Sequence, residues 1–143
     1  MTKSIKDRNK ELIEEYPWLC PDRDDDGKPA ADYDYSYTEL DLIPSGWYDL
    51  VLDLCAKLKP LLIKHGIYEK YALSEIKEKW YSLCWYDYLL DFRSVPWDVM
   101  ALVGEYLDKS TEICMTCGAP IERNQTMCDN CNKIVDSICS MPC

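Results

Sequence analysis

Hydrophobic side chains recur at helical spacing in three stretches of the chain, and the first stretch is the weakest. Ile5, Leu12, Ile13 and Tyr16 give a sparse apolar stripe within residues 3–16, with polar side chains between them. Pro17 follows at once, and proline disrupts a helix interior because it lacks a backbone donor. The pattern predicts a short amphipathic helix that ends before Pro17.

The second stretch predicts a longer helix that begins near Ser45 and ends at Gly66. Serine is a favoured N-cap, and glycine commonly follows the last turn of a helix. Pro60 lies inside the pattern, so we expect a kink or a division there. One face collects the apolar side chains, which are Trp47, Leu50, Val51, Leu54, Cys55, Leu58, Leu61 and Leu62.

The third helical stretch covers residues 94–111, and a β-rich stretch over residues 71–90 precedes it. Pro96 suits the first turn of this helix, whose buried face is Val95, Val99, Leu102, Val103, Tyr106 and Leu107. The β-rich stretch predicts an antiparallel hairpin that turns near Tyr81 and Ser82. We expect Trp80, Trp85 and Trp97 in the core. The predicted fold class is α+β, a small domain of about three helices and one hairpin.

Two CxxC pairs give the most specific chemical signal in the sequence. Cys114 and Cys117 form the first pair, and Cys128 and Cys131 form the second, with ten residues between the pairs. Four thiolates at this spacing are typical of a tetrahedral zinc site, and a site filled by four protein ligands is structural. The prediction is a Zn²⁺-binding ribbon or knuckle over residues 113–143, after an α+β domain over residues 1–112.

The other five of the nine cysteines have less specific contexts. Cys20, Cys55 and Cys84 lie among apolar residues and are interpreted as core side chains. Cys139 and Cys143 are either alternative metal ligands or free thiols, and the spacing does not decide between them. A redox function is disfavoured because the pairs do not lie at a strand-to-helix junction.

The net charge of −10 comes mostly from one segment, because residues 22–53 carry ten acidic and two basic side chains. One interpretation is an acidic, tyrosine-rich surface for a basic protein partner, since tyrosine gives contact area and carboxylates steer association. The other is a solvated loop whose tyrosines pack onto the domain. A calcium loop fails at Tyr33, where the pattern requires glutamate. The candidate partner-binding residues are Asp22, Asp24, Asp25, Asp26, Asp32, Tyr33, Asp34, Tyr35, Tyr37 and Glu39.

The sequence lacks the motifs that are typical of several functional classes. The chain has no glycine-rich phosphate loop and no Gly-x-Ser-x-Gly turn, and its single histidine is His65, so we expect no enzyme activity. The acidic balance counts against direct contact with DNA or RNA phosphates. No apolar run is long enough for a membrane helix, and the first residues lack a signal core, so a cytoplasmic location is expected.

Five strings of the sequence resemble a widespread family of small uncharacterised proteins from bacteriophages and mobile elements, whose members end in a CxxC…CxxC zinc knuckle. They are EYPWLCP at 15–21, DYDYSYTELD at 32–41, Gly46-Trp47, IKEKW at 76–80 and LCWY at 83–86. The chain departs from the family in the hairpin. Tyr81 stands where the family tends to have glycine, and Cys84 where it tends to have arginine.

The resemblance implies a phage-type accessory protein that acts in the host cell by binding host machinery. An anti-CRISPR-like inhibitor fits this class, with carboxylates that imitate phosphates in the basic channel of a Cas-type nuclease. One alternative is a zinc-ribbon protein that binds nucleic acid or regulates transcription, using Lys57, Lys59, Lys64, Lys70, Lys77 and Lys79. Another is a structural or protein-interaction module of the phage particle. The sequence does not indicate an oligomeric state.

Overall fold

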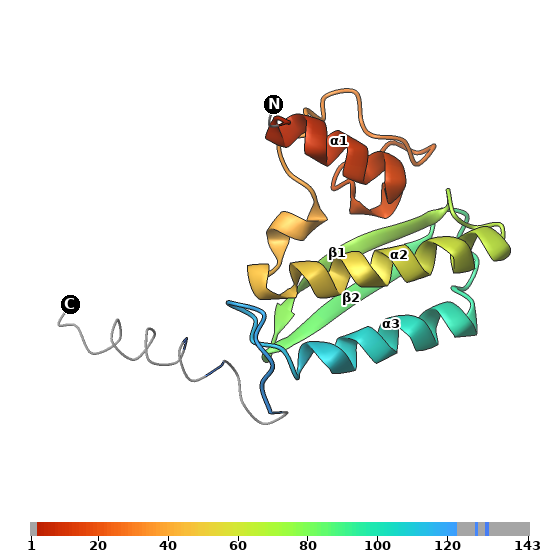
Figure 1. The fold of residues 1–143 in the computed structure, drawn as a ribbon. Helices are drawn as coiled ribbons and strands as arrows, with labels where there is room; N and C mark the ends of the chain where they lie inside the picture. Colours follow the sequence, from red (N-terminus) through yellow and green to blue (C-terminus); the bar gives the residue numbers. More distant parts are fainter. Residues whose placement is uncertain (1–2, 123–127, 129–130, 132–143) are drawn as a thin grey trace.

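The computed structural model describes residues 3–122, 128 and 131, and within them it contains three α-helices and one antiparallel sheet of two strands (Figure 1). The helices and strands are α1 (Ile5–Glu15), α2 (Tyr48–Lys64), β1 (Tyr71–Lys79), β2 (Ser82–Leu89) and α3 (Trp97–Ser110). Short 3-10 helices cover Pro17–Leu19 (η1), Glu39–Leu42 (η2) and Ser45–Trp47 (η3). The predicted three helices and hairpin are confirmed. No helix in this part of the chain is long and apolar enough to cross a membrane.

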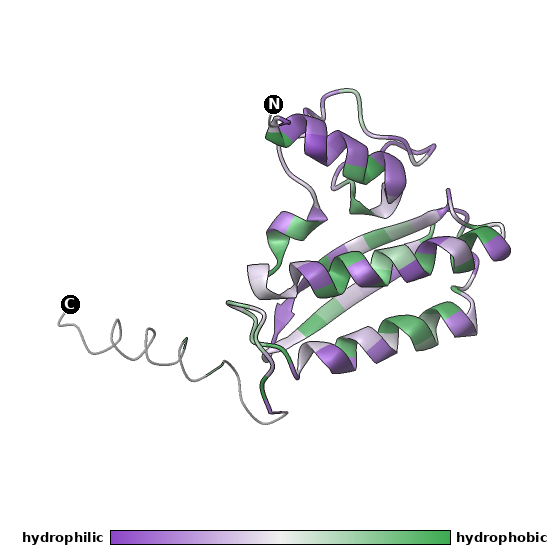
Figure 2. Ribbon diagram, viewed as in Figure 1, coloured by the Kyte–Doolittle hydropathy of each residue, from purple (hydrophilic) through white to green (hydrophobic). Residues whose placement is uncertain are grey.

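The core lies where α2 and α3 pack against the hairpin. In Figure 1 the two helices run side by side in opposite directions. After α1 the chain returns to the body, where Trp18 of η1 is buried in the core. Hydrophobic residues mark α2, α3 and both strands, whereas α1 is largely hydrophilic (Figure 2). Side chains that are almost completely buried come from η1, η3, α2, both strands and α3, and they include Trp18, Trp47, Leu54, Leu58, Ile76, Leu83, Val99 and Tyr106.

Helix α2 begins and ends close to the predicted positions. Ser45 starts the 3-10 turn η3 rather than capping α2 itself, and Gly66 follows the helix with a φ of +69°, which suits glycine. Pro60 does not divide the helix. Both Pro60 and Ala56, whose carbonyl oxygen loses its usual donor, are exposed. Water can therefore replace the missing hydrogen bond at this position.

The hairpin turns one residue earlier than predicted. Lys79 pairs with Ser82, and the two residues between them, Trp80 and Tyr81, have φ values of 54° and 63°. Positive φ at both central residues is the geometry of a type I′ turn, which connects twisted strands. Trp80 therefore lies at the tip and is 84% exposed, so its predicted place in the core is wrong.

Of the other two tryptophans expected in the core, only Trp85 is buried. Trp97 is 79% exposed. It is the first residue of α3, two residues before the buried Val99. Two residues along a helix correspond to a rotation of about 200°, so Trp97 lies on the opposite face from Val99.

Candidate metal centre and acidic surface

The four cysteines of the CxxC pairs lie together in the structure. The Sγ atoms of Cys114, Cys117, Cys128 and Cys131 are all within 4.8 Å of one another, and those of Cys117 and Cys128 are 3.5 Å apart. Tetrahedral zinc with Zn–S bonds of about 2.3 Å needs sulfur atoms separated by roughly 3.8 Å. The cluster could therefore hold a metal ion such as zinc.

The backbone of the first CxxC pair is arranged as a tight turn around Cys114. The N–H of Gly118 donates to the carbonyl oxygen of Cys114 at 2.8 Å, and Gly118 has a φ of +80°. Burial by itself would raise the pKa of the Cys114 thiol. Backbone amides of Cys128, Cys117 and Thr116 outweigh that effect and lower the pKa to about 6. Cys114 is thus favoured as a thiolate, the form that binds metals.

The same turn packs against the start of α2. The indole Nε1 of Trp47 donates to the carbonyl oxygen of Ile113 at 3.2 Å, and the hydroxyl of Ser45 donates to the carbonyl oxygen of Thr116 at 3.3 Å. Both Trp47 and Cys114 are completely buried. The first cysteine pair is therefore joined to the α-helical body through η3.

Gly46 is the residue at which the turn and the body approach most closely. Its N–H donates to the carbonyl oxygen of Met115 at 2.8 Å. A Cβ atom at this position would lie 2.2 Å from the carbonyl oxygen of Cys114 and 2.6 Å from the carbonyl carbon of Met115. Only glycine fits so close to another backbone. The sequence shows a glycine directly before Trp47. It does not indicate the close approach, because the contact partner lies about 70 residues further along the chain.

The remaining cysteines lie outside the cluster. Cys20 and Cys55 are buried, as predicted, and Cys84 is half-buried on β2. Burial raises the pKa of the Cys55 thiol to about 12, while the indole of Trp18 donates to its sulfur at 3.3 Å. Cys139 and Cys143 lie outside the described residues.

The acidic segment begins with a loop that Arg23 fastens to the body. Its guanidinium donates from Nε to the carbonyl oxygen of Gly27 at 2.7 Å, from Nη1 to that of Tyr71 at 2.9 Å, and from Nη2 to that of Glu69 at 3.2 Å. Arg23 also pairs with Pro29 in an isolated antiparallel bridge. The hydrogen bonds to Glu69 and Tyr71 hold the loop at residues 22–29 against the start of β1.

The loop also contains hydrogen bonds of its own. The carboxylate of Asp24 accepts from the N–H groups of Asp26 and Lys28 at 2.9 and 3.0 Å, and the N–H of Gly27 donates to the carbonyl oxygen of Asp24 at 2.9 Å. Oδ1 of Asp24 therefore stabilises the backbone of the loop. The calcium interpretation has no support, because the only cluster of three or more potential metal ligands found among the described residues is the four-cysteine group.

The structure exposes some of the candidate partner-binding residues and buries others. Tyr33 and Glu39, predicted to face a partner, are buried, and Tyr35 is half-buried. Tyr33 packs with Ile13 and Cys20 in a small second core, and its hydroxyl donates to the carbonyl oxygen of Tyr37. The exposed members of the set are Asp22, Asp24, Asp25, Asp26, Asp32, Asp34 and Tyr37. We call their six aspartates the acidic surface.

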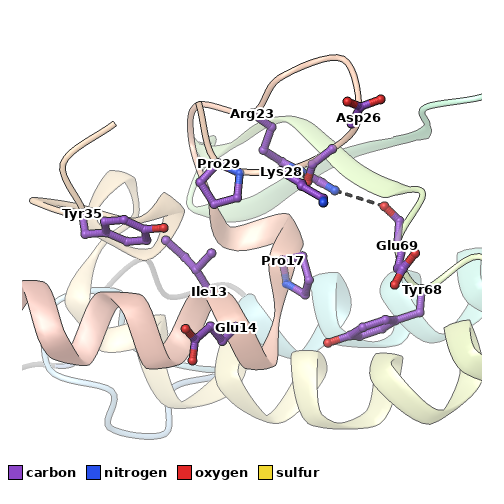
Figure 3. Close-up of a pocket in the computed structure, with 11 residues that line it drawn as sticks. Ile13, Glu14, Pro17, Arg23, Asp26, Lys28, Pro29, Tyr35, Tyr68 and Glu69 are labelled. Carbon is purple, nitrogen blue, oxygen red and sulfur yellow. Dashed lines mark hydrogen bonds between the residues drawn. The ribbon is translucent and has the colours of Figure 1, made fainter. Parts of the chain in front are cut away.

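A hollow of about 570 Å³ lies beneath the acidic loop (Figure 3). Tyr35 and Tyr68 lie on opposite sides of it, and Ile13 and Pro17 are also among its walls. Its charged lining residues are Glu14, Arg23, Asp26, Lys28 and Glu69. The hollow thus places aromatic and proline side chains next to carboxylates beside the acidic surface.

The buried Glu39 makes the stability of the protein depend on pH. Burial raises the pKa of its carboxyl from the ordinary 4.5 to about 7. The folded state therefore retains a proton that the unfolded state releases, so stability falls as the pH rises from about 4.5 to about 7. We expect Glu39→Gln to be more stable than the unchanged protein by up to about 3 kcal/mol above pH 7, since one pKa unit corresponds to about 1.4 kcal/mol.

Urea unfolding at pH 4.5 and at pH 8 measures this effect. Glu112→Gln is the matched control, because it makes the same chemical change at an exposed side chain. We expect the stabilisation by Glu39→Gln to vanish at pH 4.5 and the control to remain unchanged at both pH values. An equal effect of Glu39→Gln at both pH values would contradict the assignment.

Comparisons with known proteins identify no relative of this chain. No family model matches the chain, and neither a curated protein nor a solved structure matches it. The resemblance to small phage proteins therefore stays a prediction from the sequence, and the candidate sites rest on the geometry of this chain.

Proposed function

We propose that the protein is a non-enzymatic inhibitor that binds the basic nucleic-acid channel of a host defence enzyme. The observation that carries the proposal is the acidic surface, six exposed aspartates on a segment that hydrogen bonds fix to the body. Carboxylates at fixed spacing imitate phosphates, and lysine and arginine side chains of a channel would supply the complement. A Cas-type nuclease is the first class of partner to test.

The anchoring by Arg23 favours this function over that of a solvated loop. A flexible loop loses conformational entropy when it binds, which costs about 1–2 kcal/mol for each residue that becomes ordered. The loop at residues 22–29 is already held by three bonds from Arg23 and two to Asp24. A preorganised surface avoids much of that cost. The hollow between Tyr35 and Tyr68 offers additional contact area next to the carboxylates.

The metal serves a structural purpose in this proposal. Four cysteine ligands fill every position of a tetrahedral zinc ion, which leaves none for a substrate or an activated water. The cluster lies next to η3, so zinc would hold residues 113–122 on the start of α2. Zinc would then act as a brace for the body that carries the acidic surface.

Direct nucleic-acid binding has weaker support because several of the candidate lysines already have acidic partners. Lys57 pairs with Asp53 at 3.3 Å, and Lys59 pairs with Glu15 at 3.0 Å. Lys77 pairs with its neighbour Glu75 at 3.1 Å. Neutralised lysines provide little attraction for phosphates, whose binding needs a basic footprint.

Charge reversal on the acidic surface tests the proposal. The triple variant D25K/D26K/D32K changes three aspartates whose side chains make none of the loop hydrogen bonds, and it leaves Asp24 and Asp34 in place. We expect it to bind a Cas-type nuclease at least roughly tenfold more weakly at low salt, because each reversed charge removes an attraction and adds a repulsion. Biosensor titration over a salt series measures the affinity, with the nuclease free and loaded with guide RNA.

The matched control is D49K/E105K/E112K, which changes the net charge equally on exposed residues of α2, of α3 and of the segment after α3. The control should bind within about twofold of the unchanged protein, and the difference between the triple variants should shrink as salt rises. Occupying the channel with guide RNA should weaken binding of the unchanged protein. Equal loss of affinity in both triple variants would reject the acidic surface as the binding site. A salt-sensitive gel shift of DNA or RNA by the unchanged protein would favour the nucleic-acid-binding alternative.

A further inference from the structure

The outer edge of β2 carries backbone groups that have no partner in the described chain. The register pairs Cys84 with Lys77 and Trp85 with Ile76. In an antiparallel hairpin with a two-residue turn, backbone groups point alternately toward and away from the partner strand, and those of Leu83 and Trp85 point away. Leu83 confirms this, because its N–H donates to the hydroxyl of Ser110 on α3 at 2.9 Å.

Trp85 differs from Leu83 because, within the part of the chain that the structure describes, its backbone has no hydrogen-bond partner on α3. Within residues 3–122, no hydrogen bond to its backbone N–H or C=O is found outside the β1–β2 pairing. The side chain of Trp85 is fixed in the core, where Nε1 donates to the hydroxyl of Tyr71 at 2.8 Å. The fixed side chain holds the backbone N–H and C=O of Trp85 in one outward orientation.

These groups face a groove of about 300 Å³ between β2 and the second half of α3. The lining residues of this groove are Ser82, Leu83, Cys84, Trp85, Tyr86, Leu107, Asp108 and Thr111. Asp108 is the only charged member of that set. The groove thus combines an unpaired strand edge, apolar side chains and a single negative charge.

The two edges of the sheet are protected to different degrees. Strand β1 carries four charged residues in its second half, and Arg23 caps the carbonyl oxygen of Tyr71 at its beginning. Charged side chains and covered ends are common means by which proteins prevent additional strands from pairing. Strand β2 has eight residues, no proline and no lysine, and Asp87 is its only charged residue. The edge of β2 is therefore open to a further strand at Trp85, beyond the position where α3 covers Leu83.

We propose that the edge of β2 binds an extended, basic segment of a partner protein as a third strand of the sheet. The backbone of that segment would pair with the N–H and C=O of Trp85, and its apolar side chains would contact Leu107 and Tyr86. A lysine or arginine of the segment would face Asp108. A second copy of this chain suits the groove less well, because two chains of charge −10 repel each other. This surface is separate from the acidic surface and does not depend on its function.

A model peptide tests the strand addition directly. The probe is acetyl-(Val-Lys)4-amide, and its control is the same sequence with every backbone nitrogen methylated, which keeps the charges and removes the donors. We expect the unmodified peptide to bind at least tenfold more tightly in a calorimetric titration. Amide hydrogen exchange followed by NMR should show that it slows exchange at Trp85 N–H.

Variants on α3 separate the groove from general attraction to a basic peptide. Asp108→Lys should weaken binding of the unmodified peptide about threefold or more, whereas Glu112→Lys, four residues further and outside the groove, should change it little. Equal affinity of the two peptides, or unchanged exchange at Trp85, would overturn the proposal. Slow exchange at Trp85 that appears only with dimer formation, and without peptide, would assign the edge to a second copy instead.

Discussion

Gly46→Ala is expected to lower the free energy of unfolding by roughly 3 kcal/mol and to weaken metal binding. The added methyl group would lie 2.2 Å from the carbonyl oxygen of Cys114 and 2.6 Å from backbone atoms of Met115, so backbone must move to make room. Overpacking of this kind costs about 1–3 kcal/mol, and loss of the hydrogen bond from Gly46 to Met115 adds about 1 kcal/mol. Urea unfolding and the metal content of the purified variant measure the two effects.

The chain provides a control with the opposite expected sign. Gly104 lies inside α3, and a Cβ atom built there meets no atom within 4 Å. Alanine favours a helix interior over glycine by about 1 kcal/mol, so Gly104→Ala should stabilise the protein. If Gly46→Ala were as stable as the unchanged protein and held the same amount of metal, the close approach of η3 to the cysteine turn would be incorrect.

Removal of the metal is expected to have an effect of similar size. We expect one zinc ion per chain, and we expect a chelator to lower the melting temperature and the free energy of unfolding. A ligand that binds only the folded state stabilises it by about 2.7 kcal/mol when its free concentration is a hundredfold above its dissociation constant. Cys114→Ser should have the same consequence, because Cys114 is both a cluster member and completely buried.

Cys84→Ser is the matched control for the cysteine variant. Cys84 is half-buried on β2 and lies outside the cluster, so its replacement should leave the zinc content unchanged. Substitution by cobalt(II) should give the visible absorption of tetrahedral thiolate coordination in the control but not in Cys114→Ser. A melting temperature that does not respond to chelator in the unchanged protein would exclude a structural metal at this cluster.

Short-range patterns in the sequence were sufficient to predict most of the regular structure. The apolar spacing of α2 and α3 and the alternation in the hairpin depend only on residues a few positions apart, and these elements lie where they were expected. The hairpin turn was displaced by one residue because Trp80 and Tyr81 are unusual at positive φ, and no local glycine marked the turn. That displacement also explains why Trp80 was wrongly placed in the core.

In the candidate sites too, features with a local sequence pattern could be predicted, and features that depend on distant contacts could not. The spacing of the CxxC pairs is local, and it identified the four cysteines that lie together in the structure. Arg23 and Gly46 act through contacts 46–69 residues away, and no periodic pattern reveals such partners. Glu39 was placed on the surface because it is charged, yet it belongs to a 3-10 turn that packs inward.

The contact between η3 and the cysteine turn also affects the order in which the chain can fold during its synthesis. A ribosome produces Trp47 long before it produces Ile113, the carbonyl partner of the Trp47 indole. Until then the large, apolar Trp47 side chain lacks the segment that completes its burial. Cys131 is made later still, so the metal can be fully enclosed only after the helical body has left the ribosome. The nascent body therefore depends on Ile113 and Met115, which are translated after it, for the packing at the start of its first long helix.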